Sequence, residues 1–551
     1  MSVPAASCFA QAVSTSAATI ALRASLVFID ISPKEARVVL IRPRPGEAVP
    51  SPFPGRGDGK FYRSPGTIGK AAGHVRAFVS AWDDKLRLWL TGDKRMSENE
   101  PASALSRGLE ESFGPHLAAI CDRTARTLEA CGFTGLLVHS GSALTVFEDD
   151  RTYPFVAHAP FKVWVPLADA PDSYIWFAPG SRPKLILHQP RDYWYKPADL
   201  PRGYWVRQFD VCPAPDSASA RAALPEDLSR AAYIGDATAE IAAWGPGAVN
   251  PRELMRQLDY DRAAKSPYEL ACMRAANRLG ARGHLAATRA FQAGASEFEI
   301  ELEFIAACGL REQELPYNPI IALNEGGAVL HYQVLNKHAP RERHSLLIDA
   351  GAEFAGYASD ITRTHSYQDA DFRALIGRMD ELQQRLCAGV RAGVDWRDVH
   401  LEAHAQTGRL LKEADLTRCS GEESVATGVT KVFLPHGIGH LLGLEVHDVG
   451  GFMKARGDGD IPRPEGHPYL RLTRVLEPGF VVTMEPGIYF IPQLLEAARA
   501  DDKLSSRINW PRVAGLMKFG GIRIEDDLAV TPSGCENLTR DAFRAAAAGN
   551  A

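Results

Sequence analysis

Five side chains of the types that bind metal ions are spread along the C-terminal half of the chain, each within a short motif marked by Gly or Pro. They are Asp349, Asp360, His440, Glu485 and Glu525. Carboxylate oxygens suit Mn, Mg or Ca, and a single imidazole shifts the preference toward Mn, Co, Fe or Zn. Four carboxylates with one histidine therefore predict a site for two divalent metal ions.

The first two of these residues lie in the segment "LLIDAGAEFAGYASDITRTH" (346–365), whose β-rich ends flank a centre that contains glycine. This pattern predicts two strands joined by a turn. A turn centred near Phe354 and Ala355 would place Asp349 and Asp360 opposite each other in an antiparallel pair. Directly opposed carboxylates repel, so the pair makes sense if a cation lies between them.

The segment "FLPHGIGHLLGLEVHDVGGFM" (433–453) holds His436, His440 and His447 among several glycines. Its glycines allow close approach of the backbone and argue against a regular helix. One isolated histidine is more often structural than catalytic. Three within twelve residues, in a chain that also has the aspartate pair, predict one metal ligand and two helpers.

Two further carboxylates end or follow apolar segments. Glu485 follows the apolar run "FVVTM", where a carboxylate is costly unless it is paired or binds metal. The segment "GGIRIEDDLAVT" (520–531) predicts a strand on which Arg523 and Glu525 share one face. The alternative is a salt-bridged surface face, but the alternating isoleucines mark only the opposite face as core.

Composition limits the class of protein. The net charge is -5 with both signs mixed along the chain, which excludes the basic stripe of a nucleic-acid binder. The nine cysteines are scattered and form no CxxC pair, which favours a cytoplasmic protein with free thiols. No apolar run reaches the roughly 18 residues of a membrane span. Residues 1–28 lack acidic side chains, which is typical of organelle-targeting peptides, but they hold only one basic residue. An organelle-targeting segment is therefore a weak alternative to a cytoplasmic location.

The length of 551 residues predicts several domains. Residues 1–95 hold 14 Lys and Arg against 7 Asp and Glu and include the Pro/Gly-rich segment 42–60. We interpret them as an atypical extension. It is disordered, or it results from a wrongly assigned start when translation truly begins at Met96. Alternatively, it is a genuine module in which residues 25–30 and 36–41 form a hairpin.

Residues 96–255 predict an α/β domain that forms the dimer contact. We expect a helix at 116–132 and strands at 134–141, 162–167, 174–178 and 183–188. Aromatic clusters in this domain favour core and a subunit face over ligand stacking. Residues 256–551 form the catalytic domain, with a helix that begins at Pro267, capped by Ser266 in a capping box with Glu269.

The D-x10-D pair and the motifs "HGIGH", "HDVGG", "EPGIYF" and "GGIRIED" resemble those of the pita-bread metallopeptidases. The phrases "HPYLRLTRVLEPG", "INWPRV" and "PYNPIIALNEGGAVLHY" are similar to the bacterial prolidase (Xaa-Pro dipeptidase) branch, which includes organophosphorus acid anhydrolase. The resemblance covers about residues 105–545. It implies an α+β protein, in which a pita-bread catalytic domain follows a smaller α/β domain.

The resemblance also implies roles for the ligands. Asp349 would bind one metal, Asp360 and Glu525 would bridge both, and His440 with Glu485 would complete the second. The two ions would be Mn2+, and a hydroxide that bridges them would attack the scissile carbonyl. Glu485 would carry the proton.

Other residues would assist without binding metal. His331 and His447 would donate hydrogen bonds to the developing charge, and His436 is a further non-ligand site residue. Arg523 would bind the carboxylate at the C-terminal end of the substrate; the alternative is that it is a structural partner of a metal ligand. Tyr317 would hydrogen-bond the bound substrate.

The implied activity is hydrolysis of Xaa-Pro dipeptides, small peptides that end in proline, with phosphotriester hydrolysis as a side activity. The alternatives are an aminopeptidase P that acts on longer peptides and a non-catalytic peptide-binding relative. The segment "VFEDDRTYPF" (146–155) matches a loop that reaches the neighbouring subunit in a prolidase homodimer. Asp150 would there bind the α-amino group of the substrate, or it is an ordinary solvated turn residue.

Overall fold

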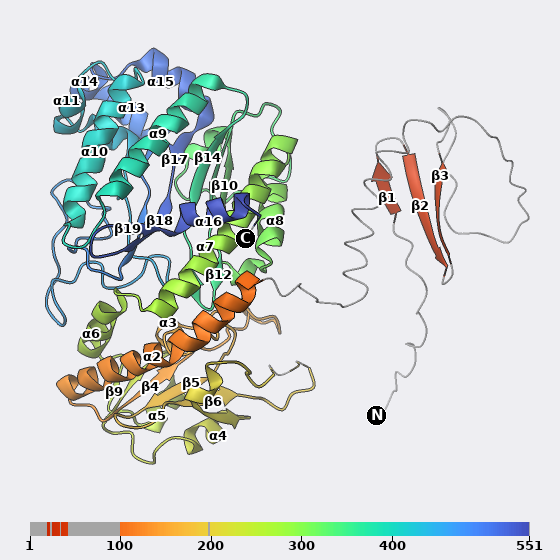
Figure 1. Cartoon of the computed structure of the whole chain (residues 1–551), viewed down its shortest axis with the longest axis vertical. Coiled ribbons are helices and arrows are strands. Elements are labelled where there is room, and N and C mark those ends of the chain that lie inside the picture. The colour runs from red at the N-terminus through yellow and green to blue at the C-terminus, as the bar shows by residue number, and fades with distance from the viewer. Residues whose placement is uncertain are drawn as a thin grey trace, which may run out of the picture. The chain divides into compact units, whose positions relative to one another are not determined.

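The computed structural model describes residues 100–549, except 195, 197 and 198, together with three strands nearer the N-terminus. The chain divides into two compact units, Met1–Arg95 and Met96–Ala551. In the first unit, β1 (Thr19–Leu22), β2 (Ser25–Ser32) and β3 (Glu35–Ile41) form an antiparallel sheet in that order (Figure 1). The segments predicted as a hairpin pair in this sheet. The Pro/Gly-rich segment 42–60 and the candidate start at Met96 lie outside the described residues.

The second unit begins with α2 (Glu100–Cys131), which lies along a six-stranded sheet of order β7-β6-β5-β4-β8-β9 (Figure 1). The strands are β4 (Gly135–His139), β5 (Tyr174–Phe177), β6 (Lys184–His188), β7 (Asp210–Ala214), β8 (Ala231–Ile234) and β9 (Ala248–Val249). Antiparallel pairs join β4 to β5 and β5 to β6, whereas the other pairs are parallel. Helices α4 (Ser217–Ala222) and α5 (Ala239–Trp244) contribute to the apolar cluster on one face, and α2 to the cluster on the other.

One predicted strand in this domain is wrong. Lys162 ends α3 (Ala159–Lys162), and residues 163–167 follow as turns and irregular chain. Val163, Trp164 and Val165 are buried all the same. A short apolar run is compatible with any buried conformation, and Pro160 at the start of α3 favours a helical turn.

The larger part of the unit begins after α6 (Arg252–Arg262), a helix that contains the domain boundary expected at residue 255. α7 (Pro267–Ala293) starts as the sequence predicts: the Ser266 hydroxyl accepts from the Glu269 amide at 3.3 Å and the Ser266 amide donates to Glu269 at 2.7 Å. α7 packs against α8 (Glu297–Cys308) and α16 (Leu538–Ala547). The remaining helices are α9 (Ala370–Gly389), α10 (Trp396–Glu413), α11 (Gly421–Ala426), α12 (Val429–Phe433), α13 (Pro492–Ala500), α14 (Asp502–Ser505) and α15 (Trp510–Leu516).

Antiparallel strands form the inner layer of this part, and helices lie outside them (Figure 1). The sheets are β10-β11-β14, β15-β18-β19 and β16-β17. Their strands are β10 (Ile320–Leu323), β11 (Ser345–Asp349), β14 (Thr362–Ser366), β15 (Val481–Met484), β16 (Gly487–Tyr489), β17 (Gly521–Arg523), β18 (Asp526–Val530) and β19 (Cys535–Asn537). A single bridge between Thr362 and Glu525 links the first sheet to the segment between β17 and β18.

One apolar cluster connects the two parts of the second unit. Leu109 and Phe113 of α2 belong to the same buried cluster as Leu442, Leu444 and Val481 of the larger part. Removal of such side chains from water is the main favourable term in folding. The two parts therefore stabilise each other and hold the larger part in one orientation against the sheet.

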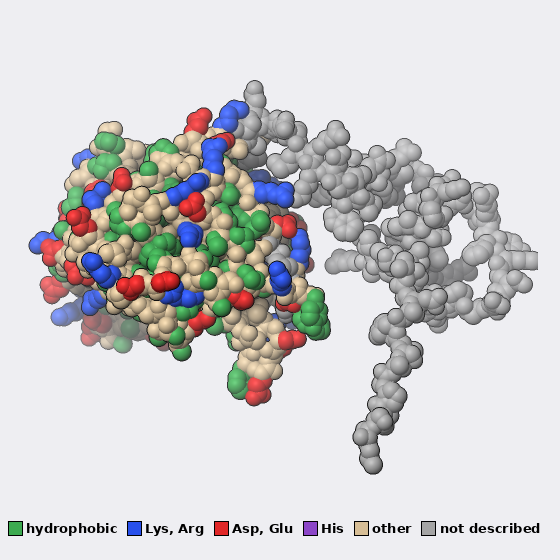
Figure 2. All heavy atoms as spheres, turned by 90° about the horizontal axis from the view of Figure 1, so that it is seen from below, with side chains coloured by type: hydrophobic (Ala, Val, Ile, Leu, Met, Phe, Trp, Pro, Cys, Tyr) green, Lys and Arg blue, Asp and Glu red, His purple; other side chains and the backbone are tan. Residues whose placement is uncertain are grey.

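The surface and the thiols agree with the expectations from composition. Acidic and basic side chains are interspersed on the face shown in Figure 2. The eight described cysteines are free thiols, and each is buried or half-buried. Within the described residues, no helix combines the length and the apolar character that crossing a membrane requires.

Candidate metal centre

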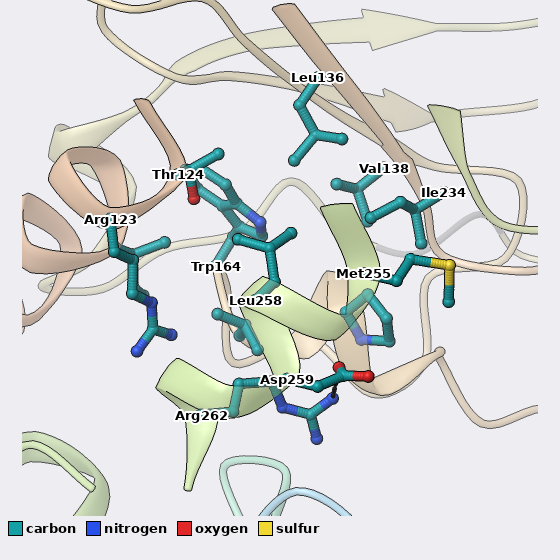
Figure 3. Close-up of a pocket in the computed structure, with 13 residues that line it drawn as sticks. Arg123, Thr124, Leu136, Val138, Trp164, Ile234, Met255, Leu258, Asp259 and Arg262 are labelled. Carbon is teal, nitrogen blue, oxygen red and sulfur yellow. Dashed lines mark ion pairs between the residues drawn. The ribbon is translucent and has the colours of Figure 1, made fainter. Parts of the chain in front are cut away.

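The five predicted metal ligands lie in the lining of one cavity of about 1150 Å³ in the larger part of the second unit. A different cavity, between α2, β4 and α6, measures about 40 Å³ and is lined mainly by apolar side chains such as Leu136 and Trp164 (Figure 3). Its Asp259 and Arg262 form an ion pair at 3.8 Å. Cavities that bind small molecules measure roughly 300 to 1,000 Å³. The cavity of about 40 Å³ is far below this range, whereas the large cavity has room for a ligand and holds the predicted metal ligands, so it is the candidate site.

The aspartate pair lies on a strand–hairpin–strand unit. Between the two residues, β12 (Glu353–Phe354) pairs with β13 (Tyr357–Ala358) through a tight turn, and Ala355 and Gly356 both have positive φ, at 53° and 89°. This is one residue later than predicted. Consequently Asp349 lies opposite Thr362 rather than opposite Asp360.

The two aspartates are diagonal neighbours that still converge. The Tyr317 hydroxyl lies 2.9 Å from Asp349 Oδ1 and 2.6 Å from Asp360 Oδ1. Tyr317 therefore contacts the carboxylates directly, and contact with a substrate, as first expected, stays a prediction. Diagonal partners in a sheet remain within reach of each other, so the offset does not separate the pair.

The other ligands gather around Asp360. Asp360, His440 and Glu525 each offer one ligand atom, and these atoms lie within 4.8 Å of one another. His440 Nε2 lies 3.5 Å from Asp360 Oδ2 and 3.7 Å from Glu485 Oε1. His440 Nδ1 bonds the Leu441 carbonyl at 3.0 Å, which makes Nδ1 the protonated nitrogen and leaves Nε2 to bind a metal.

The electrostatics of the centre fit two divalent cations. Burial raises the pKa of Glu525 well above its usual range, and the charges of Asp360 and Glu485 raise it further. Burial also raises the pKa of Glu485 to about 7, although His440 and Arg523 oppose the change. Burial opposes the charged form of His440, but its bond to Asp360 and the charge of Glu485 outweigh burial and raise its pKa to about 9. Carboxylates that lie this close together repel one another and therefore keep protons. Bound cations would replace those protons and neutralise the negative charge.

Arg523 is buried and already has three partners in the protein. Its guanidinium donates to Asp349 at 2.6 Å, to the Thr362 hydroxyl at 3.1 Å and to the Tyr489 hydroxyl at 2.9 Å. These contacts favour the alternative role, in which Arg523 positions a metal ligand. Arg523 and Glu525 also converge as predicted, because both bond the Thr362 hydroxyl.

The three helper histidines lie on the same cavity in different environments. His436 is bonded to the Gly437 carbonyl at 2.7 Å and to the Tyr489 hydroxyl at 2.8 Å. The His447 ring lies 4.4 Å from the His440 ring between centroids. His331 is exposed at the mouth. Burial lowers the pKa of both His436 and His447 to about 4, so both rings are neutral at pH 7.

Several residues of the site have no clear signal in the sequence. Asp527 Oδ2 accepts from the Asp360 amide at 3.0 Å and from Asn277 at 2.8 Å, and so positions the aspartate backbone. Arg471 lines the cavity, is exposed, and its charge contributes to the low pKa of His447. The only available signal was the adjacency of these residues to recognised motifs: Asp527 follows "GGIRIED" and Arg471 lies in "HPYLRLTR".

Asp150 is the one predicted site residue that lies apart from the others. It is exposed at the tip of a small hairpin closed by a bridge between Thr145 and Thr152. It is not among the residues that line the large cavity of its own chain. Leu144 and Phe147 on the same hairpin are 68% and 86% exposed, which is the kind of surface that contacts a partner.

Comparisons with known proteins agree with this geometry. A family model described as the N-terminal domain of Xaa-Pro dipeptidase matches residues 111–260, and one described as metallopeptidase family M24 matches residues 271–532. The Xaa-Pro dipeptidase of Xanthomonas axonopodis pv. citri (strain 306) is 47% identical over 439 residues, 80% of this chain and 99% of the relative. That of Stenotrophomonas maltophilia (strain K279a) is 47% identical over 79% of this chain and 98% of the relative.

Solved structures with a similar fold are aminopeptidases P. The Escherichia coli enzyme with the inhibitor Pro-Leu has a TM-score of 0.61 at 23% identity, covering 79% of this chain and 95% of that chain. A Pseudomonas aeruginosa aminopeptidase has a TM-score of 0.59 at 23% identity, covering 78% and 98%. At this identity the likeness confirms the fold, an α/β domain followed by a pita-bread domain.

Proposed function

We propose that this chain, which belongs to metallopeptidase family M24 in its Xaa-Pro dipeptidase branch, hydrolyses dipeptides whose second residue is proline. The observation that carries this function is the convergence of five metal-ligand side chains on one cavity. It is supported by 47% identity over 99% of the length of a curated dipeptidase.

The residues of the cavity divide the chemistry among them. When bound, two divalent ions lower the pKa of a shared water toward neutrality and polarise the scissile carbonyl; their ligands would be Asp349, Asp360, His440, Glu485 and Glu525. The carboxylate of Glu485 accepts the proton of the attacking water and delivers it to the proline nitrogen. His331 and His447 donate hydrogen bonds to the carbonyl oxygen as charge develops there. The oxygen-rich ligand set supports Mn2+.

The test of this function compares substrates of two lengths. After chelation and restoration with Mn2+, the protein should cleave Xaa-Pro dipeptides and fail on Xaa-Pro-Yaa tripeptides. The second candidate, an aminopeptidase P, rests on the fold likeness alone and expects the tripeptides to be cleaved. Cleavage of neither would leave a non-catalytic role. Phosphotriester hydrolysis is proposed as a side activity of the same centre.

We expect Arg471, rather than Arg523, to hold the carboxylate of the substrate. Arg471 is exposed in the cavity, whereas the guanidinium of Arg523 is occupied by Asp349. Loss of a charge-assisted contact is worth about 1.5 to 3 kcal/mol. Arg471→Ala should therefore raise KM for free dipeptides far more than for dipeptides with a blocked carboxylate, measured by initial rates.

Two variants make this prediction discriminating. Arg523→Ala should lower metal content and harm free and blocked substrates equally, because it acts through Asp349. Arg373→Ala removes an exposed arginine outside the cavity and should change neither constant. If Arg523→Ala raised KM for free dipeptides but not for blocked ones, Arg523 would be the residue that binds the substrate carboxylate.

We propose that the protein is a cytoplasmic homodimer in which Asp150 of one subunit binds the α-amino group of a substrate in the other. The exposed apolar side chains of the Asp150 hairpin support an interface there. Asp150→Ala should raise KM for Xaa-Pro by about 10-fold or more with metal content unchanged. Asp199→Ala, which is similarly exposed, is the control. A fully active monomer in sedimentation experiments would rule out the shared site.

A further inference from the structure

Three histidines outside the catalytic cavity form a cluster of their own. His400 and His404 are one turn apart on α10, where a spacing of four places both on the same face. His467 comes from residues 462–471, here called the cavity loop. One nitrogen of each ring lies within 4.8 Å of the others. His400 and His404 are 1% and 2% exposed, and His467 is half-buried.

The three rings are arranged as ligands of one ion would be. His400 Nε2 lies 2.8 Å from His467 Nδ1, and the ring centroids are 4.6 to 4.9 Å apart. His404 Nδ1 bonds the Thr430 hydroxyl at 3.1 Å, which leaves its Nε2 for the cluster. A hydrogen bond to the far nitrogen is how proteins orient a histidine that binds metal. The far nitrogen of His400, Nδ1, is buried with no hydrogen-bond partner, so the protein orients the His404 ring but not the His400 ring through its far nitrogen.

The charge state of the rings permits metal binding. Burial lowers the pKa of His400 to about 2 and that of His404 to about 3, so both are neutral at pH 7 and keep a free lone pair. Outside the cluster, Lys431 is the charged group that acts on these rings at pH 7, because His436, the other group near them, is neutral at that pH. Lys431 is exposed, so water screens its repulsion of a cation.

We propose that His400, His404 and His467 bind a third divalent ion, Zn2+, separate from the catalytic pair. Three neutral imidazoles favour Zn2+ over Mn2+, Mg2+ and Ca2+, which prefer oxygen ligands. The catalytic set, with four carboxylates, has the opposite preference. Water would complete the coordination of the ion, because the cluster offers three protein ligands.

The ion fixes the cavity loop to α10. Pro468 and Tyr469, which follow His467 directly, line the catalytic cavity, and so does Arg471. A zinc bound by His467 therefore holds one wall of the substrate cavity against a helix of the core. The role is structural, because the cluster itself is not among the residues that line that cavity.

Metal counting tests the site without any measurement of activity. Chelated protein is dialysed against Zn2+ or Mn2+, and metal per chain is measured by mass spectrometry. We expect three Zn2+ but two Mn2+ in the wild type. His467→Gln should bind two Zn2+, whereas His338→Gln, which removes an exposed histidine elsewhere, should keep three. With Co2+, the intense visible absorption of a tetrahedral site should be lost in His467→Gln alone.

Graded variants sharpen the result. Thr430→Val removes the hydrogen bond to His404 and should raise the Kd of the third Zn2+ by about 10- to 100-fold, the usual effect of losing such a partner. Lys431→Gln removes a charge that water already screens and should leave that Kd nearly unchanged. Equal Zn2+ counts in the wild type and His467→Gln would overturn the proposal and make the cluster a metal-free hydrogen-bonded group. If His467→Gln does not fold, an unchanged Kd of the third Zn2+ in Thr430→Val overturns the proposal equally.

Discussion

Asp360→Asn should abolish turnover while the protein stays folded. Asp360 is the residue on which the centre converges: its carboxylate lies 3.5 Å from His440 and 2.6 Å from the Tyr317 hydroxyl, and its amide is held by Asp527. An amide has no negative charge to share between two cations. We expect kcat to fall by about 10³-fold or more, which corresponds to about 4 kcal/mol of transition-state stabilisation.

Metal content and stability must be measured on the same variant. Metal per chain should drop, and the melting temperature without metal should fall slightly, because Asn still accepts from the Tyr317 hydroxyl but loses the charge that pairs with His440. Asp398→Asn, at an exposed position on α10, is the matched control and should keep full activity. A variant with both ions bound and more than a few per cent of wild-type kcat would show that Asp360 does not bridge them.

Glu485→Gln should give the second-largest loss, about 10² to 10⁴-fold in kcat, the usual range for a general acid or base. Burial raises the pKa of Glu485 to about 7 in the metal-free protein. Bound cations lower this pKa, so Glu485 is a carboxylate that can accept the proton of the attacking water. Gln cannot accept a proton. The loss of kcat should therefore exceed any loss of metal, which is measured in parallel.

The pH dependence of metal binding gives a second measurement. Glu485 must lose a proton and His440 must be neutral before they bind a cation, and their pKa values in the metal-free protein are about 7 and about 9. Metal affinity should therefore fall as the pH is lowered through this range. In Glu485→Gln the dependence around pH 7 should be weaker, whereas Glu496→Gln, an exposed control on α13, should match the wild type. Identical pH profiles in all three proteins would contradict a titrating Glu485.

Local rules were sufficient where a short segment determines its own structure. The α7 start followed from Ser266, Pro267 and Glu269, because a capping box satisfies the end of a helix with neighbouring residues. The irregular course of residues 434–453 followed from their glycines. The ligand set was visible because its members lie in four short motifs, one of which holds both Asp349 and Asp360.

Hydrophobic periodicity did not predict where one strand ends and the next, paired with a different neighbour, begins. Residues 522–525 alternate, and the sequence predicts that the strand continues over 520–531, yet β17 pairs with β16 and β18 pairs with β15, with Glu525 between them. Alternation reports which face is buried and not which strand lies beside it. The offset between Asp349 and Asp360 also escaped the pattern. A turn that lies one residue later changes which residues of the two strands are opposite each other.

Contacts between distant segments had no sequence signal. The i,i+4 spacing of His400 and His404 is readable on a helix, but His467 joins them only because the cavity loop returns to α10. Arg471 lies in irregular chain with no periodic pattern, and Arg523 looked available for substrate until its three internal partners were known. Such side chains are assigned by packing, which one sequence does not specify.

The bridge between Thr362 and Glu525 has a consequence for the synthesis of the protein. Ribosomes add about 5 to 20 residues per second, so Glu525 leaves the ribosome about 10 to 30 seconds after the aspartate pair. During that interval β14, which follows Asp360, lacks the neighbour that Thr362 bridges to, and the nascent chain has only part of the ligand set. Metal can be captured tightly only after the strands around Glu525 have docked. A cell short of metal should therefore accumulate finished, folded and empty protein rather than stalled or misfolded chains.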